Sequence, residues 1–453
     1  MKRTAFVFTL SVLTGCMTTQ PEDAATRARP DGAEVRAVAP QALSRSPGSI
    51  QRSNSNITSD FLSLHFELES GRQLPVLTRF EGPVTVRMTG RPVSTLQRDL
   101  TALLGRLRNE ADISISQIGT GRASITIESV PRSEIQRSLP GAACFIAPGV
   151  SSLSEYRKSR GISWASLTRR EKVAIVIPAD AGPQEARDCL HEELAQALGP
   201  LNDLYRLPDS VFNDDNVHSV LTGFDMLVLR ATYAPELRSG MTRTEVAARL
   251  PALLARLNPA GVQVAPHAFT ETPRDWINAI KSALGPDASH SSRVLAANRA
   301  LNTASRLGWQ DHRRALSHFT IGRMAQMSDP AAAQQHYALA LTYLSSSPYT
   351  ALHRAFITSQ TAAFAIANGD GAGALQQIEP VLGVAQRAEN AALLATLMLL
   401  KAEALELTGQ PGQARAVRLD SLGWARYGFG SEQAVRARMN EISSLNPRNR
   451  RNG

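Results

Sequence analysis

Residues 189–203 read Cys-Leu-His-Glu-Glu-Leu-Ala-Gln-Ala-Leu-Gly-Pro-Leu-Asn-Asp, and this stretch decides the fold of the first half of the chain. Its leucines recur at every fourth position, which predicts a helix that opens near Gln184 and ends at Gly199. The apolar run before it, residues 173–177, is typical of a strand with both faces buried. The stretch therefore predicts a strand followed by a helix that packs on a sheet.

Further strands and another helix are expected upstream, so the predicted fold class is α+β, with a mixed sheet and packed helices. Residues 84–88 alternate like a half-buried strand, and a helix is expected from Ser94 to about residue 109. Residues 113–118 and 123–127 also alternate, with two glycines between them, and we expect them to be neighbouring strands.

The second part of the chain, residues 289–446, is rich in alanine and leucine and predicts an all-α domain. Turns at Ser328, Gly369 and Gly409 are each followed five residues later by alanine. Their spacing of about 40 residues predicts antiparallel helical hairpins, in which alanine allows close approach. The pattern resembles tetratricopeptide-like repeats, and the alternative is an irregular helical bundle. Either arrangement would supply a scaffold or docking surface.

His191-Glu192 matches the start of the zinc-protease motif HExxH, but the second histidine is missing. Zinc needs two ligands one helical turn apart on a single face, and Ala195 stands four residues after His191. This frame therefore predicts no zinc site.

With the frame moved by one residue, Glu192-Glu193-x-x-Gln196-x-x-Gly199-x-x-Asn202 resembles the metzincin pattern HExxHxxGxxH. The resemblance implies that Glu193 is the general base, if the site has one, and that Gly199 ends the helix. It also puts Glu192, Gln196 and Asn202 where three histidine ligands would lie. These side chains offer oxygen atoms, which suit harder cations and bind zinc weakly. An active zinc protease is therefore not expected, and no cofactor, zinc or other divalent metal is expected.

A closer resemblance covers roughly residues 60–250. Together with Ser210-x-Phe212-Asn-Asp and Leu-Thr222-x-x-Asp225, the helix motif is similar to that of a bacterial lipoprotein family known as domain of unknown function 2927. The resemblance implies a cell-envelope location and brings no established activity.

Three interpretations of the helix motif and its flank remain open. Glu192, Glu193, Gln196, Asn202 and Asp203 could line a cleft that binds a peptide, a polar envelope ligand or an unusual metal. They could instead form a hydrogen-bond network that replaces a lost metal, since buried polar groups must be paired. In the third interpretation, the domain is an envelope hydrolase in which Glu193 activates water.

Several other polar residues are weaker candidates. Asp214, Asp215 and Asn216 could bind Ca²⁺, or this acidic loop could simply face solvent. His191, His218 and two histidines in the helical part, at positions 312 and 353, are expected to pack or to form hydrogen bonds.

The first sixteen residues predict export and lipidation. Two basic residues precede a short apolar run that ends in Leu13-Thr-Gly-Cys16, which resembles the lipobox of bacterial lipoproteins. The resemblance implies a lipid on Cys16 as the membrane anchor, with the protein facing the periplasm from the inner or the outer membrane. Residues 17–57 are polar and predict a flexible tether.

Export also bears on the remaining cysteines. After lipidation only Cys144 and Cys189 are left, and an oxidising compartment favours a bridge between them, with two buried thiols as the alternative. The bridge would close a loop of about 45 residues and contribute about 4 kcal/mol by the chain-entropy argument.

The charge of +9 over 453 residues does not predict nucleic-acid binding, because the basic residues are scattered and no nucleic-acid motif is present. An envelope protein or polysaccharide is the expected partner. The predicted organisation is a signal peptide (1–16), tether (17–57), metzincin-like domain (58–250), connector (251–288), helical domain (289–446) and basic tail (447–453).

Overall fold

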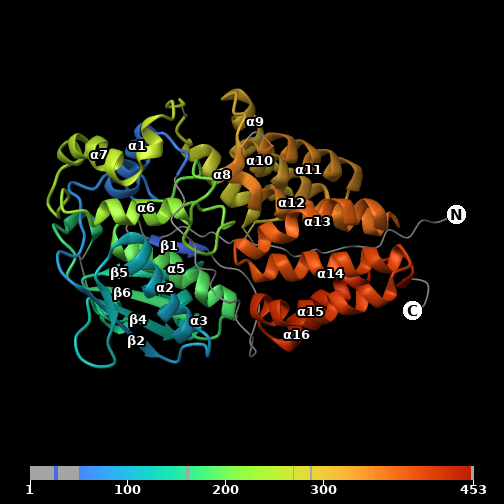
Figure 1. Ribbon diagram of the computed structural model, residues 1–453, viewed down its shortest axis with the longest axis horizontal. Coiled ribbons are helices and arrows are strands. Elements are labelled where there is room, and N and C mark those ends of the chain that lie inside the picture. The colour runs from blue at the N-terminus through green and yellow to red at the C-terminus, as the bar shows by residue number, and fades with distance from the viewer. Residues whose placement is uncertain are drawn as a thin grey trace. The chain divides into compact units, whose positions relative to one another are not determined.

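The computed structural model describes residues 25–28, 50–159, 163–268, 270–285, 288–345 and 347–449 (Figure 1). The chain divides into two compact units with a boundary between Glu271 and Thr272. The predicted signal peptide and Cys16 lie outside the described residues, as does most of the predicted tether.

Two described parts of the predicted tether form secondary structure. Residues Ala25–Ala28 form strand β1, and helix α1 (Asn54–Phe66) begins inside the expected tether. Ser53 caps α1 by accepting a hydrogen bond from the Ser55 backbone N–H, and Ile57 is fully buried. The folded chain therefore starts earlier than residue 58, because the apolar face of α1 belongs to the core.

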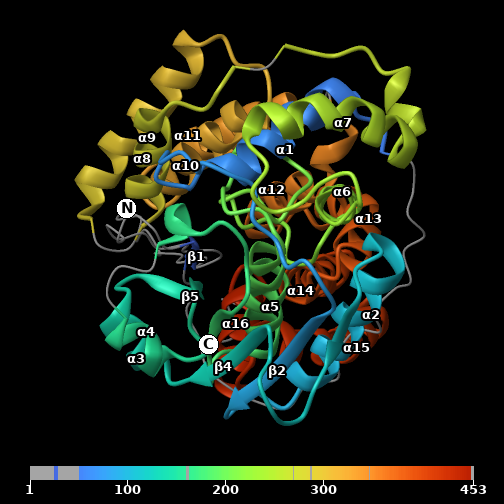
Figure 2. The same cartoon turned by 90° about the vertical axis from the view of Figure 1, so that its left-hand side faces the viewer.

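The first unit contains a mixed sheet of six described strands in the order β1-β5-β6-β4-β2-β3. Figure 2 shows β1, β5, β4 and β2 of this sheet. Neighbouring strands among β3, β2, β4 and β6 are parallel, and β5 is antiparallel to β6. The strands span β2 (Val84–Gly90), β3 (Ile115–Gln117), β4 (Ile125–Val130), β5 (Ala142–Pro148) and β6 (Val173–Pro178). The α+β prediction is confirmed at this level.

The predicted pairing of the two alternating strands is wrong. Both β3 and β4 pair with β2, one on each side, so they are not neighbours. Alternation identifies a strand but not its partner, and the turn between them does not form a hairpin because both strands run parallel to β2.

Helices cover both faces of the sheet. One face packs against α2 (Leu96–Ala111) and α5 (Pro183–Leu198), and its core includes Val173 and Ile175 of β6. The other face packs against α3 (Arg132–Ser138) and α4 (Leu153–Lys158), with Val176 between. The residue before α2 is Thr95, which makes no side-chain cap, so the predicted cap at Ser94 is not formed.

The rest of the first unit continues the main core beyond the sheet. It consists of α1, α6 (Gly223–Thr232), α7 (Arg243–Leu257) and the short helices η1 (Trp164–Ser166) and η2 (Pro259–Val262). Because α7 runs past residue 250, the end of the predicted domain and the start of the connector fall inside a helix.

The second unit is helical. Helix α8 (Arg274–Leu284) packs on α9 and so extends this unit into the predicted connector. The helices that follow are α9 (His290–Arg306), α10 (His312–Ala325), α11 (Pro330–Leu344), η3 (Pro348–Thr350), α12 (Ala351–Ala367), α13 (Gly371–Arg387), α14 (Ala391–Leu407), α15 (Pro411–Phe429) and α16 (Glu432–Ser443).

The three predicted turns each lie between two helices that pack together, α10–α11, α12–α13 and α14–α15. The alanines five residues later, Ala333, Ala374 and Ala414, are fully buried. Arginines hold two helix ends in this unit. Arg354 donates to the carbonyls of Leu344 and Ser347 at the end of α11, and Arg448 donates to those of residues 406 and 407 at the end of α14.

Within the residues that the structure describes, no helix is both long enough and apolar enough to span a bilayer.

Candidate functional site

Helix α5 carries most of the predicted site. Pro183 occupies its first turn, where a missing N–H costs nothing, and Gly199 is its C-cap. All sixteen residues of the helix are buried. Glu192, Glu193 and Gln196 are therefore buried polar groups, and their spacing of three and four residues makes them neighbours on the helix surface.

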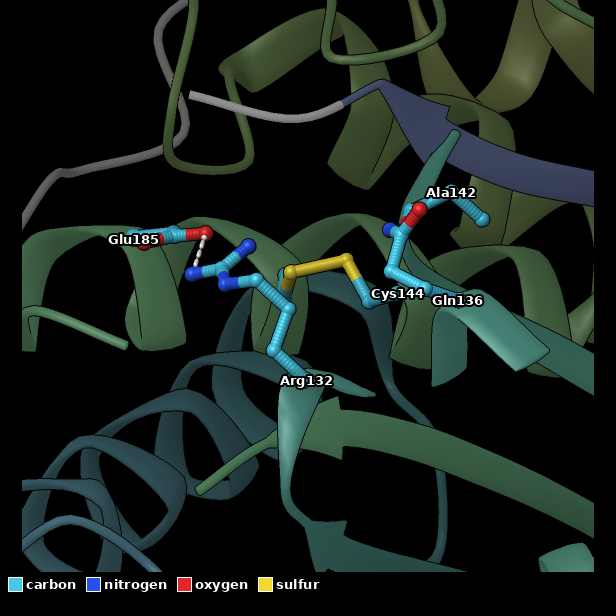
Figure 3. The surroundings of a disulfide bond; sticks show 6 residues. Arg132, Gln136, Ala142, Cys144 and Glu185 are labelled. Atoms are coloured by element: carbon cyan, nitrogen blue, oxygen red, sulfur yellow. Dashed lines mark hydrogen bonds and ion pairs between the residues drawn. A yellow bond between two sulfur atoms is a disulfide. The ribbon is translucent and has the colours of Figure 1, made fainter. Parts of the chain in front are cut away.

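A disulfide attaches α5 to the sheet. Cys189 in α5 is bonded to Cys144 in β5, with their Cα atoms 6.0 Å apart, which confirms the predicted pair (Figure 3). Nearby, Arg132 donates to the Glu185 carboxylate at 2.6 Å, so the first half of α5 is also tied to α3. These bonds fix the helix that carries the polar residues.

The C-terminal end of α5 is held by Arg170. Its guanidinium donates to the backbone carbonyls of Gln196 and Gly199 and to the Thr78 hydroxyl, and it lies over the Trp164 ring. Burial lowers the pKa of Arg170 to about 10, so it stays charged at neutral pH. A cation here is favourable because the last carbonyls of a helix carry partial negative charge. Arg79 holds the end of α6 in the same way. It donates to the backbone carbonyls of Thr232, the last residue of α6, and of Ala234 just beyond it.

Position 199 requires glycine because a larger residue would not fit against the neighbouring side chains. A Cβ atom at this position would lie 2.9 Å from Thr232 Cγ2 and 3.0 Å from His65 Nε2. Those two side chains are hydrogen-bonded to each other at 2.9 Å, and His65 Nδ1 lies 2.9 Å from the Phe61 carbonyl. Burial lowers the pKa of His65 to about 3, so the ring is uncharged. The predicted helix break is thus also a close contact between α5, α1 and α6.

Asn202 is directed at α1. Its side-chain amide donates to the Ser63 carbonyl at 3.1 Å, and the Leu201 N–H donates to the Leu64 carbonyl at 2.8 Å. The residue at the third predicted ligand position therefore anchors the chain after α5. Asp203, next in sequence, is partly buried.

Gln196 differs from Asn202. Its side chain is fully buried, and neither its amide nitrogen nor its amide oxygen has a hydrogen-bond partner within the described residues. Buried amides in folded proteins are almost always paired, so this group needs an explanation. Glu193, three residues earlier, is equally buried.

The two motifs that follow α5 in the sequence, Ser210-x-Phe212 and Thr222-x-x-Asp225, form a hydrogen-bond network around Asp225. Its carboxylate accepts from the Ser210 hydroxyl at 2.5 Å, the Thr222 N–H at 2.7 Å and the Val211 N–H at 3.2 Å. Burial raises the pKa of Asp225 to about 6, although these hydrogen bonds oppose the rise. The network therefore joins the turn at Ser210 to the start of α6. Thr222 and Asp225 form a capping box at the start of α6, and the sequence pattern Thr-x-x-Asp indicates such a box. The hydrogen bond from Ser210 to Asp225 cannot be inferred from that pattern.

Asp215, His191 and His218, which were weaker candidates for a site, form hydrogen bonds or close contacts with nearby backbone and side-chain groups. Asp215 accepts from the Val217 N–H at 3.0 Å and from the Asn213 amide at 2.7 Å. His191 Nδ1 accepts from the Leu221 N–H at 3.2 Å, and His218 Nε2 lies 3.1 Å from the Pro208 carbonyl. The two histidines contact different backbone segments.

Sequence reasoning missed a buried ion-pair network beside the site. Arg52 pairs with Asp209 and lies 3.7 Å from Asp60, and Arg206 donates to Asp60 at 2.8 Å. Burial raises the pKa of Asp60, and both arginines oppose that rise. No local pattern indicates the Arg52–Asp209 and Arg206–Asp60 pairs, because their members are 157 and 146 residues apart.

Within the ranges given above, no three His, Cys, Asp or Glu side chains are grouped so that they could hold a metal ion. Residues 54–252 match a family model described as protein of unknown function (DUF2927), which supports the resemblance seen over residues 60–250. No curated protein and no solved structure matches the chain.

Proposed function

We propose that this chain is a lipid-anchored protein of the bacterial cell envelope whose first unit is a degenerate metzincin-like domain. In this proposal the domain binds a polar ligand, such as a peptide or another amide-bearing envelope molecule, and does not hydrolyse it. The helical unit acts as a scaffold. Cys16 carries the anchor, and the protein faces the periplasm.

The arrangement around α5 supports the metzincin-like interpretation. A mixed sheet with one antiparallel strand precedes the helix that carries the polar residues, and the chain turns sharply at Gly199. The buried turn at Ser210 then leads into α6. This order suits the predicted fold.

The residues at the ligand positions do not fit zinc. Gln196 and Asn202 offer neutral amide oxygens in place of imidazole nitrogens, and zinc sites are built from nitrogen, sulfur and carboxylate ligands. Asn202 already donates to Ser63, which orients its amide toward α1. A catalytic step through a zinc ion is therefore not part of the proposal.

The observation that carries the binding proposal is the buried carboxamide of Gln196. An unpaired buried polar group costs about 1–3 kcal/mol, and an apolar side chain of the same shape would avoid that cost. A carboxamide can donate and accept at once, so it can pair with both halves of a peptide group in a ligand. Glu192 and Glu193 lie within one helical turn of Gln196.

Replacing Gln196 with Met separates this proposal from a structural network. We expect Gln196→Met to unfold at the same or higher urea concentration, because the amide has no hydrogen-bond partner among the described residues. The matched control is Gln136→Met, which removes an amide that donates to the Ala142 carbonyl at 2.6 Å and accepts from the Gly141 N–H. That variant should lose about 1–3 kcal/mol.

The same variants are then titrated with soluble peptidoglycan fragments, which carry peptide and N-acetyl amides. Calorimetry should show binding to the wild type and to Gln136→Met, and none to Gln196→Met. A clear loss of stability in Gln196→Met, or equal binding by wild type and Gln196→Met, would contradict the proposal.

The alternative function is an envelope hydrolase with Glu193 as general base and a non-standard metal. Glu193→Gln would then abolish cleavage of the same fragments with little effect on folding. We expect no cleavage by the wild type and no stoichiometric zinc in protein purified without chelators. Changing Glu192, Gln196 and Asn202 together to His should create zinc affinity, and a folded triple variant without it would refute the shifted frame.

For the helical unit we propose tetratricopeptide-like hairpins that serve as a docking surface. The buried alanines 333, 374 and 414 at equivalent places after three turns support this proposal. Replacing Ala374 with Leu should separate α13 from its neighbours and reduce stability by about 1–3 kcal/mol, measured by urea unfolding.

A further inference from the structure

Two histidines of the helical unit face each other across neighbouring helices. His318 lies in α10 and His336 in α11, and their Nδ1 atoms are 3.0 Å apart. The His318 ring is stacked on Tyr343, with the centroids 5.5 Å apart and the planes 10° from parallel. His318 is buried and His336 is partly exposed. The pair is thus held on one side and open to solvent on the other.

Burial disfavours the protonated form of both imidazoles. It lowers the pKa of His318 to about 4, and repulsion from a protonated His336 and from Arg314 acts in the same direction. Burial also lowers the pKa of His336. Neutral imidazole is the form that binds metals.

We infer that His318 and His336 form a binding site for a divalent transition-metal ion, held by their two Nδ1 atoms in adjacent coordination positions. With metal–nitrogen distances of about 2.1 Å, nitrogens 3.0 Å apart place the two bonds about 90° from each other. That angle suits square-planar or octahedral Cu²⁺ and Ni²⁺ better than tetrahedral Zn²⁺. Water completes the coordination on the exposed side.

Metal binding at this pair requires no net release of protons from the protein. In the tautomer in which His336 carries its proton at Nδ1, this N–H donates to the Nδ1 lone pair of His318. His336, the more exposed ring, can give up this proton at Nδ1 and take one at Nε2 through solvent. Both rings then stay neutral and both Nδ1 lone pairs turn to the metal.

The guanidinium of Arg314 is close enough to His318 to disfavour a positive charge there. It lies 4.7 Å from the centroid of Tyr343, the ring on which His318 stacks. A positive charge at this place opposes a bound cation, so its removal should tighten metal binding. Removing the Arg314 charge should therefore change the metal affinity in the opposite direction from removing either histidine.

The experiment is a titration of the full chain with Cu²⁺ against a chromophoric chelator, with electron paramagnetic resonance of the bound copper. We expect one ion per chain and hyperfine splitting from two nitrogen ligands. His318→Gln and His336→Gln should each weaken binding by at least about tenfold, in line with the effect of altered metal-site residues. Arg314→Gln should strengthen it.

The chain offers a matched control in its second histidine pair. The rings of His312 and His353 are 5.9 Å apart, edge to face, and His353→Gln should leave copper binding unchanged. Circular dichroism checks that each variant is folded, and the partly exposed His336 provides a variant with little effect on the core. Copper without nitrogen splitting, or an affinity that neither His318→Gln nor His336→Gln reduces, would overturn the inference.

Discussion

Gly199→Ala tests whether the end of α5 depends on close packing. The added Cβ would lie 2.9 Å from Thr232 Cγ2 and 3.0 Å from His65 Nε2. Relieving these contacts requires Thr232 or His65 to move, which strains the hydrogen bond between them at 2.9 Å. Both side chains are buried, so the neighbouring core leaves little room for them to shift.

The expected cost follows from these two effects. Overpacking a buried site costs about 1–3 kcal/mol, and loss of one buried hydrogen bond adds about 1 kcal/mol. Gly199→Ala should therefore lower the free energy of unfolding by about 2–4 kcal/mol. For a unit of this size each kcal/mol corresponds to a fall in Tm of about 2–4 °C.

The measurement is hydrogen exchange of peptides from α1 and α5 at increasing urea, because the helical unit does not contribute to that signal. Thr232→Ser in the Gly199→Ala background removes the closest methyl group but keeps the hydroxyl, so it should restore part of the loss. Gly119→Ala is the control, since among the described residues no atom beyond its chain neighbours lies within 4 Å of the added Cβ. Unchanged stability in Gly199→Ala, or no recovery with Thr232→Ser, would refute the packing argument.

Three further predictions concern the anchor, the bridge and the buried acid. Cys16→Ser should move the protein from the detergent phase to the soluble fraction, and a wild type found wholly in the soluble fraction would contradict lipidation. Replacing Cys144 and Cys189 together by Ser should reduce stability by about 4 kcal/mol, measured by urea unfolding of oxidised and variant protein. Because burial raises the pKa of Asp225 to about 6 from 3.8, the folded state binds its proton more tightly than the unfolded state. Its contribution to stability is therefore complete below about pH 4 and is lost as the pH rises through about 6, a change of about 3 kcal/mol. Asp225→Asn should remove this difference between urea midpoints at pH 4 and pH 7.5, and an unchanged pH dependence would refute the assignment.

The sequence was most informative where a pattern is local. The period of the leucines in α5 indicated the helix, and Gly199-Pro200 indicated its end, because helix geometry depends on nearby residues. The Cys144–Cys189 pair could be predicted because the inferred compartment left only two cysteines. The alanines after the helical turns indicated tight helix pairs for the same local reason.

What could not be predicted depends on contacts between distant residues. Strand β5 was missed because Ala-Ala-Cys-Phe-Ile-Ala-Pro shows no alternation and contains a single β-branched residue, whereas the equally buried β6 is rich in valine and isoleucine. The motif showed that Asn202 and Gln196 occupy equivalent places in the pattern, but only the structure shows that Asn202 bonds to α1 and Gln196 does not. The pairing of Arg52 with Asp209 joins residues 157 apart and leaves no local trace.

The arginines at helix ends bear on the high isoelectric point of the chain. Arg79, Arg170, Arg354 and Arg448 each donate to two main-chain carbonyls just past or at the end of a helix. A forked guanidinium can reach two carbonyls at once, which the single ammonium of lysine does less well. Carbonyl oxygens carry only partial charge, so these arginines raise the net charge although their donors are already engaged. Part of the basic excess therefore has an internal use and need not indicate an anionic partner.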